Sequence, residues 1–261
     1  MTATSSGTFA PRPGSAPLGR MVRAQASMET RLLVRNGEQL LLAIVIPVIV
    51  LVGAVVGADR LGLDVGRRPV DVLTPGVLAL AVMSTSFTSL AISTGFERRY
   101  GVLKRLGSSP LPRSGLLLGK VGALLLVQVG QLFVLSCVGL ALGWQPSPGG
   151  AGLLGFVLAV LTGTFAFASL GLFLAGVLRA EATLAAANLV YLLLLAGGAV
   201  VLPASSYGDF GAIAQWLPSG ALGEATRASL TDGRLPGVEL VVLLAWGALG
   251  TVLTARTFQW E

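Results

Sequence analysis

Few residues of this chain have side chains that could carry out chemistry. The sequence contains no histidine and one cysteine, Cys137, which lies inside an apolar run. The commonest metal ligand and the commonest proton shuttle at neutral pH are therefore missing. A single cysteine also excludes an intrachain disulfide and argues against a cysteine-based metal site. We expect no catalytic residue, no metal site and no cofactor bound by this chain.

One glycine-rich segment invites comparison with a phosphate-binding loop. Residues 115–120 read GLLLGK, with three residues between the glycines where the loop needs four. Val121 stands where the loop requires Ser or Thr, and no soluble strand precedes the segment. The segment therefore does not indicate a nucleotide site.

The elements that must position any functional residue are membrane helices. The chain is 54% hydrophobic and 11% charged, whereas soluble domains carry about 25% charged residues. A bilayer core is crossed by about 20 mostly apolar residues in a helix. Six segments meet this criterion, at residues 40–56, 73–94, 121–144, 152–178, 182–202 and 237–257. The sequence predicts an all-α integral membrane protein with six transmembrane helices.

The basic residues predict how these helices are oriented. If six spans alternate, thirteen of the 18 Lys and Arg residues fall on one side and five on the other. Lys and Arg are retained on the cytoplasmic side of membrane proteins. We therefore expect a multi-pass protein of the inner (plasma) membrane with both termini in the cytoplasm. The retention of Lys and Arg on one side also accounts for the excess of basic residues behind the net charge of +6. No nucleic-acid partner is therefore expected.

Three further segments lie outside the spans. Residues 1–20 predict a disordered cytoplasmic tail, because they have neither a periodic pattern nor an apolar stretch. Residues 21–38 place Met21, Met28 and Leu32 among arginines and predict an amphipathic helix on the inner membrane surface, although a solvated basic linker is the alternative. The outer segment 203–236 is too long for a turn, and its apolar residues predict short re-entrant or interfacial helices before the last span.

The inner loop after the second span is the most informative segment. Residues 96–113 read FERRYGVLKRLGSSPLPR, and Phe96, Tyr100, Leu103 and Leu106 recur at helical spacing. Prolines at 110 and 112 end this pattern before the third span. A short amphipathic helix parallel to the inner surface is expected. The alternative is a basic turn that only fixes the topology.

This loop resembles that of the membrane subunits of ABC-2 type transporters. Members carry a pattern of the kind ERxxGxLxRLxxSPxxR followed by Leu-Leu-Gly-Lys, and a second pattern like LPxxxLxEAxRxxL before the last span. The matching residues of the first pattern are Glu97, Arg98, Gly101, Leu103, Arg105, Leu106, Ser109, Pro110, Arg113, Leu117, Leu118, Gly119 and Lys120. Those of the second are Leu217, Pro218, Leu222, Glu224, Ala225, Arg227 and Leu230.

The resemblance implies a six-span permease domain over residues 39–261 and a separate ABC ATP-binding subunit that holds ATP and magnesium. It also implies a second permease copy, expected as a homodimer in the lipid membrane, and export of a drug-like or lipid-like substrate, as in antibiotic efflux. The cytoplasmic coupling helix would bind the ATPase through Phe96, Glu97, Arg98, Arg99, Tyr100, Gly101, Leu103, Lys104 and Arg105. Spans two and five would line the substrate path through Ser86, Ser89 and Asn188.

Other classes of function fit the same helices. A secondary transporter or proton-coupled pump needs titratable groups inside the membrane, and the first five predicted spans have no Asp or Glu in their central parts. An intramembrane enzyme or assembly factor would need an acid, a base or metal ligands, which are scarce here. The pattern favours an energy source supplied by another protein. A neighbouring gene for a soluble protein with a Walker motif would discriminate these alternatives.

Overall fold

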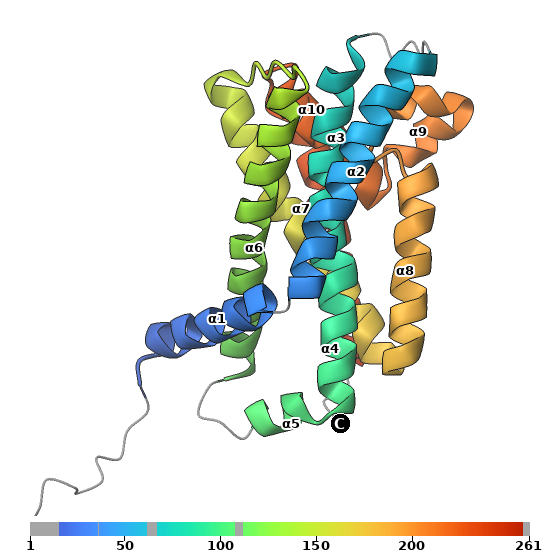
Figure 1. The fold of residues 1–261 in the computed structure, drawn as a ribbon. Helices are drawn as coiled ribbons and strands as arrows, with labels where there is room; N and C mark the ends of the chain where they lie inside the picture. The colour runs from blue at the N-terminus through green and yellow to red at the C-terminus, as the bar shows by residue number, and fades with distance from the viewer. Residues whose placement is uncertain (1–15, 36, 62–66, 108–111, 258–261) are drawn as a thin grey trace, which may run out of the picture.

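The computed structural model describes residues 16–35, 37–61, 67–107 and 112–257. Every regular element in these ranges is a helix, and the long helices stand side by side as a bundle (Figure 1). The described part therefore confirms the predicted all-α class. Of the tail predicted for residues 1–20, residues 1–15 lie outside the described residues, and the first helix already begins at Leu18.

Within the described residues, six helices are long and apolar enough to cross a membrane, which confirms the predicted number of spans. Their helices are α2 (Gly37–Leu61), α3 (Pro69–Met83) continuing through η1 (Ser84–Ser89) into α4 (Leu90–Arg99), α6 (Arg113–Ala141), α7 (Gly149–Val177), α8 (Ala180–Gly197) and α11 (Gly237–Thr257). The second span is longer at both ends than the 73–94 predicted, and the fifth ends at Gly197 rather than near residue 202.

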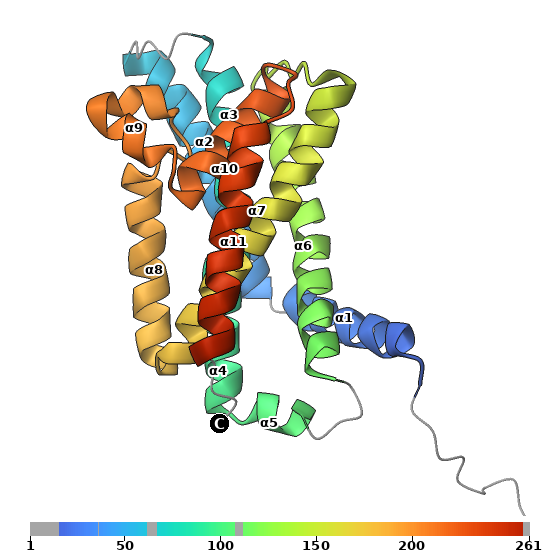
Figure 2. The same ribbon diagram turned by 180° about the vertical axis from the view of Figure 1, so that it is seen from behind.

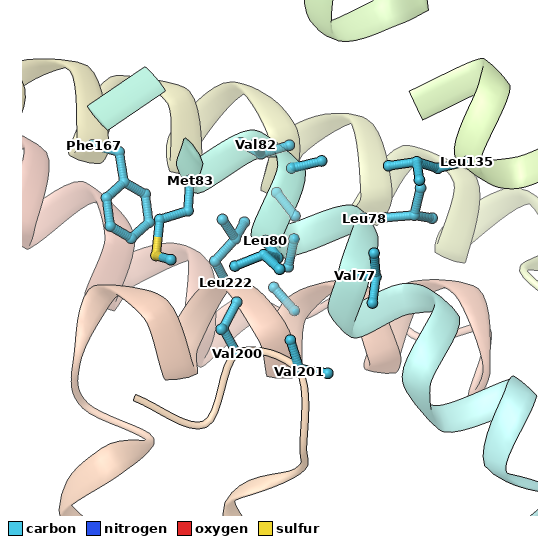
Figure 3. Packing of buried hydrophobic residues seen from close by; sticks show 14 of the residues in the cluster. Val77, Leu78, Leu80, Val82, Met83, Leu135, Phe167, Val200, Val201 and Leu222 are labelled. Carbon is cyan, nitrogen blue, oxygen red and sulfur yellow. The ribbon is translucent and has the colours of Figure 1, made fainter. Parts of the chain in front are cut away.

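The second and fourth spans form the centre of the bundle. All residues of α3 except Pro69 and Asp71 are buried. Met83 lies beside Phe167 of α7, and Val77 and Leu80 belong to the same apolar cluster (Figure 3). Because α3 is apolar on every side, it can be surrounded by other helices. By contrast, few residues of the spans in α2, α8 and α11 are buried, as expected for lipid-facing helices.

Helix α1 (Leu18–Arg35) lies across α6 rather than along the bundle (Figure 1). The crossing is close because α6 has Gly119 there, where a Cβ would come within 2.6 Å of the Gln25 Cγ. A helix is therefore present in the segment for which an amphipathic helix was expected. Its position on a membrane surface stays a prediction.

Short elements close the opposite end of the bundle. They are η2 (Ala204–Phe210), α9 (Gly211–Ala214) and α10 (Pro218–Leu230). Every residue of α10 except Glu224 is buried, and this helix packs between α3, α7 and α11 (Figure 2). The outer segment thus contains short helices, but the longest of them lies inside the bundle.

The second span contains a wide turn. Residues 84–89 (STSFTS) form a π-helix, and the side chains of Thr85 and Ser86 form hydrogen bonds with a neighbouring span. Thr85 donates to the amide oxygen of Gln131 at 2.8 Å, and Gln128 donates to the Ser86 hydroxyl at 2.7 Å. Thr164 of α7 donates to Gln128 at 2.9 Å. These bonds satisfy groups that would be costly in an apolar interior.

Candidate functional site

One end of the bundle carries most of the basic side chains, and we call it the basic end. It comprises α1, the end of α4, α5 (Val102–Gly107), the start of α6, the α7–α8 turn and the end of α11 (Figure 2). The predicted coupling segment lies here.

The coupling segment is two helices rather than one. Helix α4 continues to Arg99, a turn follows at Tyr100–Gly101, and α5 begins at Val102. Gly101 has a φ of +67°, in the left-handed region that favours glycine and that commonly ends helices. The prediction of one helix through residues 96–106 therefore differs from the structure, because Gly101 interrupts the helical spacing.

Arg98 points into the protein and holds the end of another span. Its guanidinium donates to the carbonyl oxygens of Gly176 at 2.5 Å and Leu178 at 2.9 Å. The last carbonyls of a helix lack intrahelical donors, so this arginine caps the C-terminus of α7. Its neighbour Arg99 forms an ion pair with Glu181 at the start of α8, and both of these side chains are largely exposed.

Lys120 connects three elements through buried charges. Its Nζ lies 2.6 Å from the Oε1 of Glu97 in α4 and 3.3 Å from the Oε1 of Glu29 in α1. Gln25 donates to the same Glu29 oxygen at 2.9 Å. The side chain of Lys120 is only 9% exposed. Because a buried charge that loses its partner is costly, the ends of α1, α4 and α6 are held together as a unit.

The exposed part of the coupling segment is the turn and α5. The ring of Tyr100 stacks on Phe96 with centroids 6.2 Å apart, and the Arg99 guanidinium lies 5.9 Å from the Tyr100 centroid. Tyr100, Lys104 and Arg105 are exposed. Leu103 belongs to α5, but its side chain lies outside the described residues. An aromatic and basic surface thus adjoins the buried Lys120 cluster.

The residues predicted for a substrate path are not gathered in one place. Ser86 is buried and bonded to Gln128, Ser89 is half-buried in η1, and Asn188 is exposed on α8. Ser86 and Asn188 therefore do not face a common space within one chain. Their role in a path stays a prediction.

Comparison with known proteins agrees with this architecture. A family model described as ABC-2 type transporter matches residues 22–230, which is more than half of the chain. The chain belongs to the ABC-2 type transporter family. No curated protein and no solved structure matched it. The resemblance inferred from the two patterns is confirmed.

Membership identifies the chain as a transmembrane permease of an ABC transporter. ABC-2 permeases are the membrane components of these transporters, and ATP is hydrolysed in a partner subunit. The permease has no ATPase site and no cofactor of its own. Helix α5 lies at the basic end, beyond the ends of the long helices (Figure 1).

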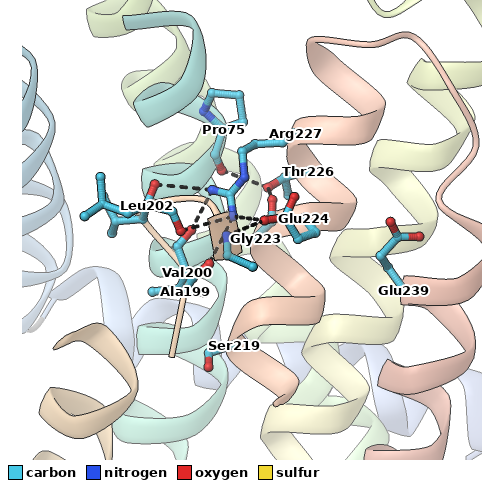
Figure 4. Close-up of polar contacts among 12 residues, drawn as sticks. Pro75, Ala199, Val200, Leu202, Ser219, Gly223, Glu224, Thr226, Arg227 and Glu239 are labelled. Carbon is cyan, nitrogen blue, oxygen red and sulfur yellow. Dashed lines mark hydrogen bonds and ion pairs between the residues drawn. The ribbon is translucent and has the colours of Figure 1, made fainter. Parts of the chain in front are cut away.

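The second ABC-2 pattern has a structural role that sequence reasoning missed. Arg227 of α10 is buried and donates to the carbonyls of Val200 at 3.0 Å and Val201 at 3.2 Å, and to that of Ala199 at 3.0 Å (Figure 4). Glu224 accepts from Arg227 at 3.1 Å and from the backbone N–H of Ala204 at 2.9 Å. The pair thus satisfies the backbone that follows α8 inside an apolar bundle.

Two glycines allow this segment to approach so closely. A Cβ at Gly76 of α3 would lie 2.4 Å from the Val201 carbonyl oxygen, and one at Gly223 of α10 would lie 2.6 Å from that of Val200.

Arg227 also acts on the nearby Tyr207. Burial raises the pKa of Tyr207, and the positive charge of Arg227 opposes this shift. The only hint of the structural role of Glu224 and Arg227 in the sequence was their spacing, three residues apart in a mostly apolar stretch.

Proposed function

We propose that this permease is the membrane subunit of an ATP-driven exporter, and that α5 with the Tyr100–Gly101 turn is its docking element for the ATPase. The observation that carries this proposal is the position of the exposed basic helix α5. It begins five residues after Glu97, the carboxylate paired with the buried Lys120. A displacement of α5 would therefore be transmitted to several helices through the charged contacts of Glu97 and Lys120.

The charge asymmetry supports a cytoplasmic location for this element. The basic end carries the larger group of Lys and Arg residues, which favours the cytoplasm. Helix α1 and the end of α11 lie at the same end (Figure 2), so both termini would be cytoplasmic in a plasma-membrane protein. ATP and magnesium would then be bound by the partner on this side.

The contacts of α4 suggest how closure of the ATPase is transmitted. Glu97 carries motion to α6 and α1 through Lys120, whereas Arg98 carries it to the end of α7. Arg99 reaches the start of α8 through Glu181. A displacement of a few ångströms at α5 would thus move four other helices, since packed elements move as rigid bodies.

Exposed faces indicate where a second permease copy would bind. Helix α8 exposes Leu189, Leu192 and Leu193, and α2 exposes Val45 and Ile49. We place a homodimer interface on α2 and α8, with Asn188 at its surface and Ser86 and Ser89 behind it. The apolar character of this surface suits a drug-like or lipid-like cargo, as in antibiotic efflux.

A matched pair of charge reversals tests the docking element. The permease is co-expressed and purified with the ATPase subunit of the neighbouring gene, and ATP-driven uptake of an amphipathic dye is measured in inside-out vesicles. Lys104→Glu on α5 should reduce ATPase recovery and dye uptake, while Arg60→Glu at the other end should leave both unchanged. Normal recovery and uptake with Lys104→Glu and Arg105→Glu combined would refute docking at α5.

A further inference from the structure

A groove on the bundle is lined by residues of α6, α7 and α11, and most of these residues belong to α7. Figure 2 shows these three helices side by side. The groove has a volume of about 430 Å³. Its walls include Val121 and Leu125 of α6, Leu161 and Leu172 of α7, and Ala255 of α11. These residues belong to candidate membrane spans, so the groove opens toward lipid.

The groove is suited to an apolar chain. Its polar lining side chains already donate hydrogen bonds within the protein: Thr164 to Gln128, Ser169 to the Ala166 carbonyl, Thr251 to the Gly247 carbonyl, and Thr254 to the carbonyls of Ser169 and Gly250. No hydroxyl of the lining is therefore left to bind a polar ligand as a donor. The remaining lining residues are aliphatic or aromatic.

Its length matches one leaflet of a bilayer. The lining of α7 runs from Leu161 to Leu172, and eleven residue steps of a helix rise by about 16 Å. This is about half of the roughly 30 Å hydrocarbon core. The lining residues lie toward the basic end of α6, α7 and α11, so the groove occupies the leaflet on that side.

An exposed cation that does not itself line the groove lies at the level of its basic end. Arg256 follows the lining residue Ala255 directly, in the last turn of α11, and is exposed. A basic residue at this level attracts anionic lipid headgroups. The groove and the face proposed for dimerisation are also separate, because α6 and α8 lie on opposite sides of α7 and α11 in both views of the bundle (Figures 1 and 2).

We infer that this groove holds one acyl chain of an anionic phospholipid from the inner leaflet, with its phosphate beside Arg256. The inner-leaflet assignment rests on the proposed orientation. The lipid site itself does not require the ATPase or the cargo. Its occupant would fill the gap between α6 and α11.

The test uses native mass spectrometry of the full chain. The protein is reconstituted with equal amounts of phosphatidylglycerol and phosphatidylcholine, extracted in mild detergent, and its bound lipids are counted. The wild type should retain one phosphatidylglycerol per chain. Ala255→Phe, which places a ring in the groove from an exposed position, should lower this occupancy about tenfold or more. Arg256→Gln should keep a bound lipid but lose the preference for phosphatidylglycerol.

Matched controls separate this proposal from its alternatives. Ala245→Phe changes an exposed alanine of the same helix that does not line the groove, and it should keep the lipid. Leu161→Trp provides a second way to fill the groove, and an unchanged melting temperature verifies the fold of each variant. Retention of the lipid by both groove variants would overturn the inference. So would loss of a dimer in Ala255→Phe, or displacement of the lipid by a transported dye.

Failure of this test leaves docking at α5 untouched, because the lipid count is made without an ATPase. Conversely, a permease that fails to bind the ATPase through α5 should still retain its phosphatidylglycerol. Docking at α5 is therefore tested by recovery of the ATPase, and the lipid site is tested by the count of bound lipids.

Discussion

The Nζ of Lys120 lies 2.6 Å from the Oε1 of Glu97, so a lysine near the start of the third span is paired with a glutamate near the end of the second. The same lysine is 3.3 Å from Glu29 of α1. One cation thus offsets two carboxylates that are mostly buried. The loop between the two spans is anchored at both ends by this contact.

Replacing Lys120 with Met should destabilise the permease, because Glu97 and Glu29 would remain buried without a counter-charge. The expected loss is about 3 kcal/mol, as for other buried pairs that lose one partner. Thermal unfolding in detergent measures this change. The control is Lys104→Met, which removes the same side chain from an exposed position and should change stability little. Equal melting temperatures for the two variants would contradict the assigned role of Lys120.

Replacing Arg98 with Ala should loosen the turn between α7 and α8 without releasing the ATPase. Two carbonyls at the end of α7 would lose their charged donor, at a cost of about 2 kcal/mol. Hydrogen exchange of residues 176–183 should accelerate, while ATPase recovery stays normal. Loss of the ATPase with unchanged exchange would show that Arg98 acts as a docking residue instead.

Replacing Arg227 with Met should disrupt the segment that follows α8. The carbonyls of Ala199, Val200 and Val201 would lose their donor inside the bundle, with an expected cost of about 4 kcal/mol. Arg227→Lys should restore only part of this stability, because an ammonium group lacks the planar fork that reaches several carbonyls. Melting temperatures give the order expected: wild type, Lys variant, Met variant. A Lys variant as stable as the wild type would show that charge alone suffices.

The orientation of the chain can be tested with reporter fusions. Fusions after residue 146 and after Glu261 should report opposite sides, since three spans separate these positions. The fusion at Glu261 should be cytoplasmic, on the basis of the Lys and Arg asymmetry. The same signal from both positions would mean that an even number of spans lies between them, and the six-span map would be wrong. An outer signal at Glu261 would mean that the charge asymmetry does not set the topology as proposed.

Hydropathy was sufficient to predict the long helices. The last span was predicted at residues 237–257, and α11 has the same bounds. Such agreement is expected because the length of an apolar run is a property of the sequence itself. The second span shows the limit of this approach: its helix continues to Arg99 because the basic residues there find partners on α7 and α8.

The roles of the charged residues depend on contacts that sequence spacing does not contain. Arg98 was predicted to face a partner protein, yet its acceptors are backbone carbonyls 78 and 80 residues away. A backbone carbonyl carries no signature in the sequence. Similarly, the burial of α10 requires the glycines at 76 and 223 to meet the segment after α8. The exposed basic surface of α5 was easier to predict, since its charges and its helical form are local.

The wide turn at residues 84–89 gives the second span a mechanical property of its own. A π-helical turn holds one residue more than an α-helical turn. If this segment rewound as ordinary α-helix, everything beyond Leu90 would rotate about the helix axis by about 100°. Glu97 would swing away from Lys120, and Arg98 away from Gly176. The second span therefore has one defined position, the π-helical turn, at which a rotation of α4 and α5 about the helix axis can be accommodated.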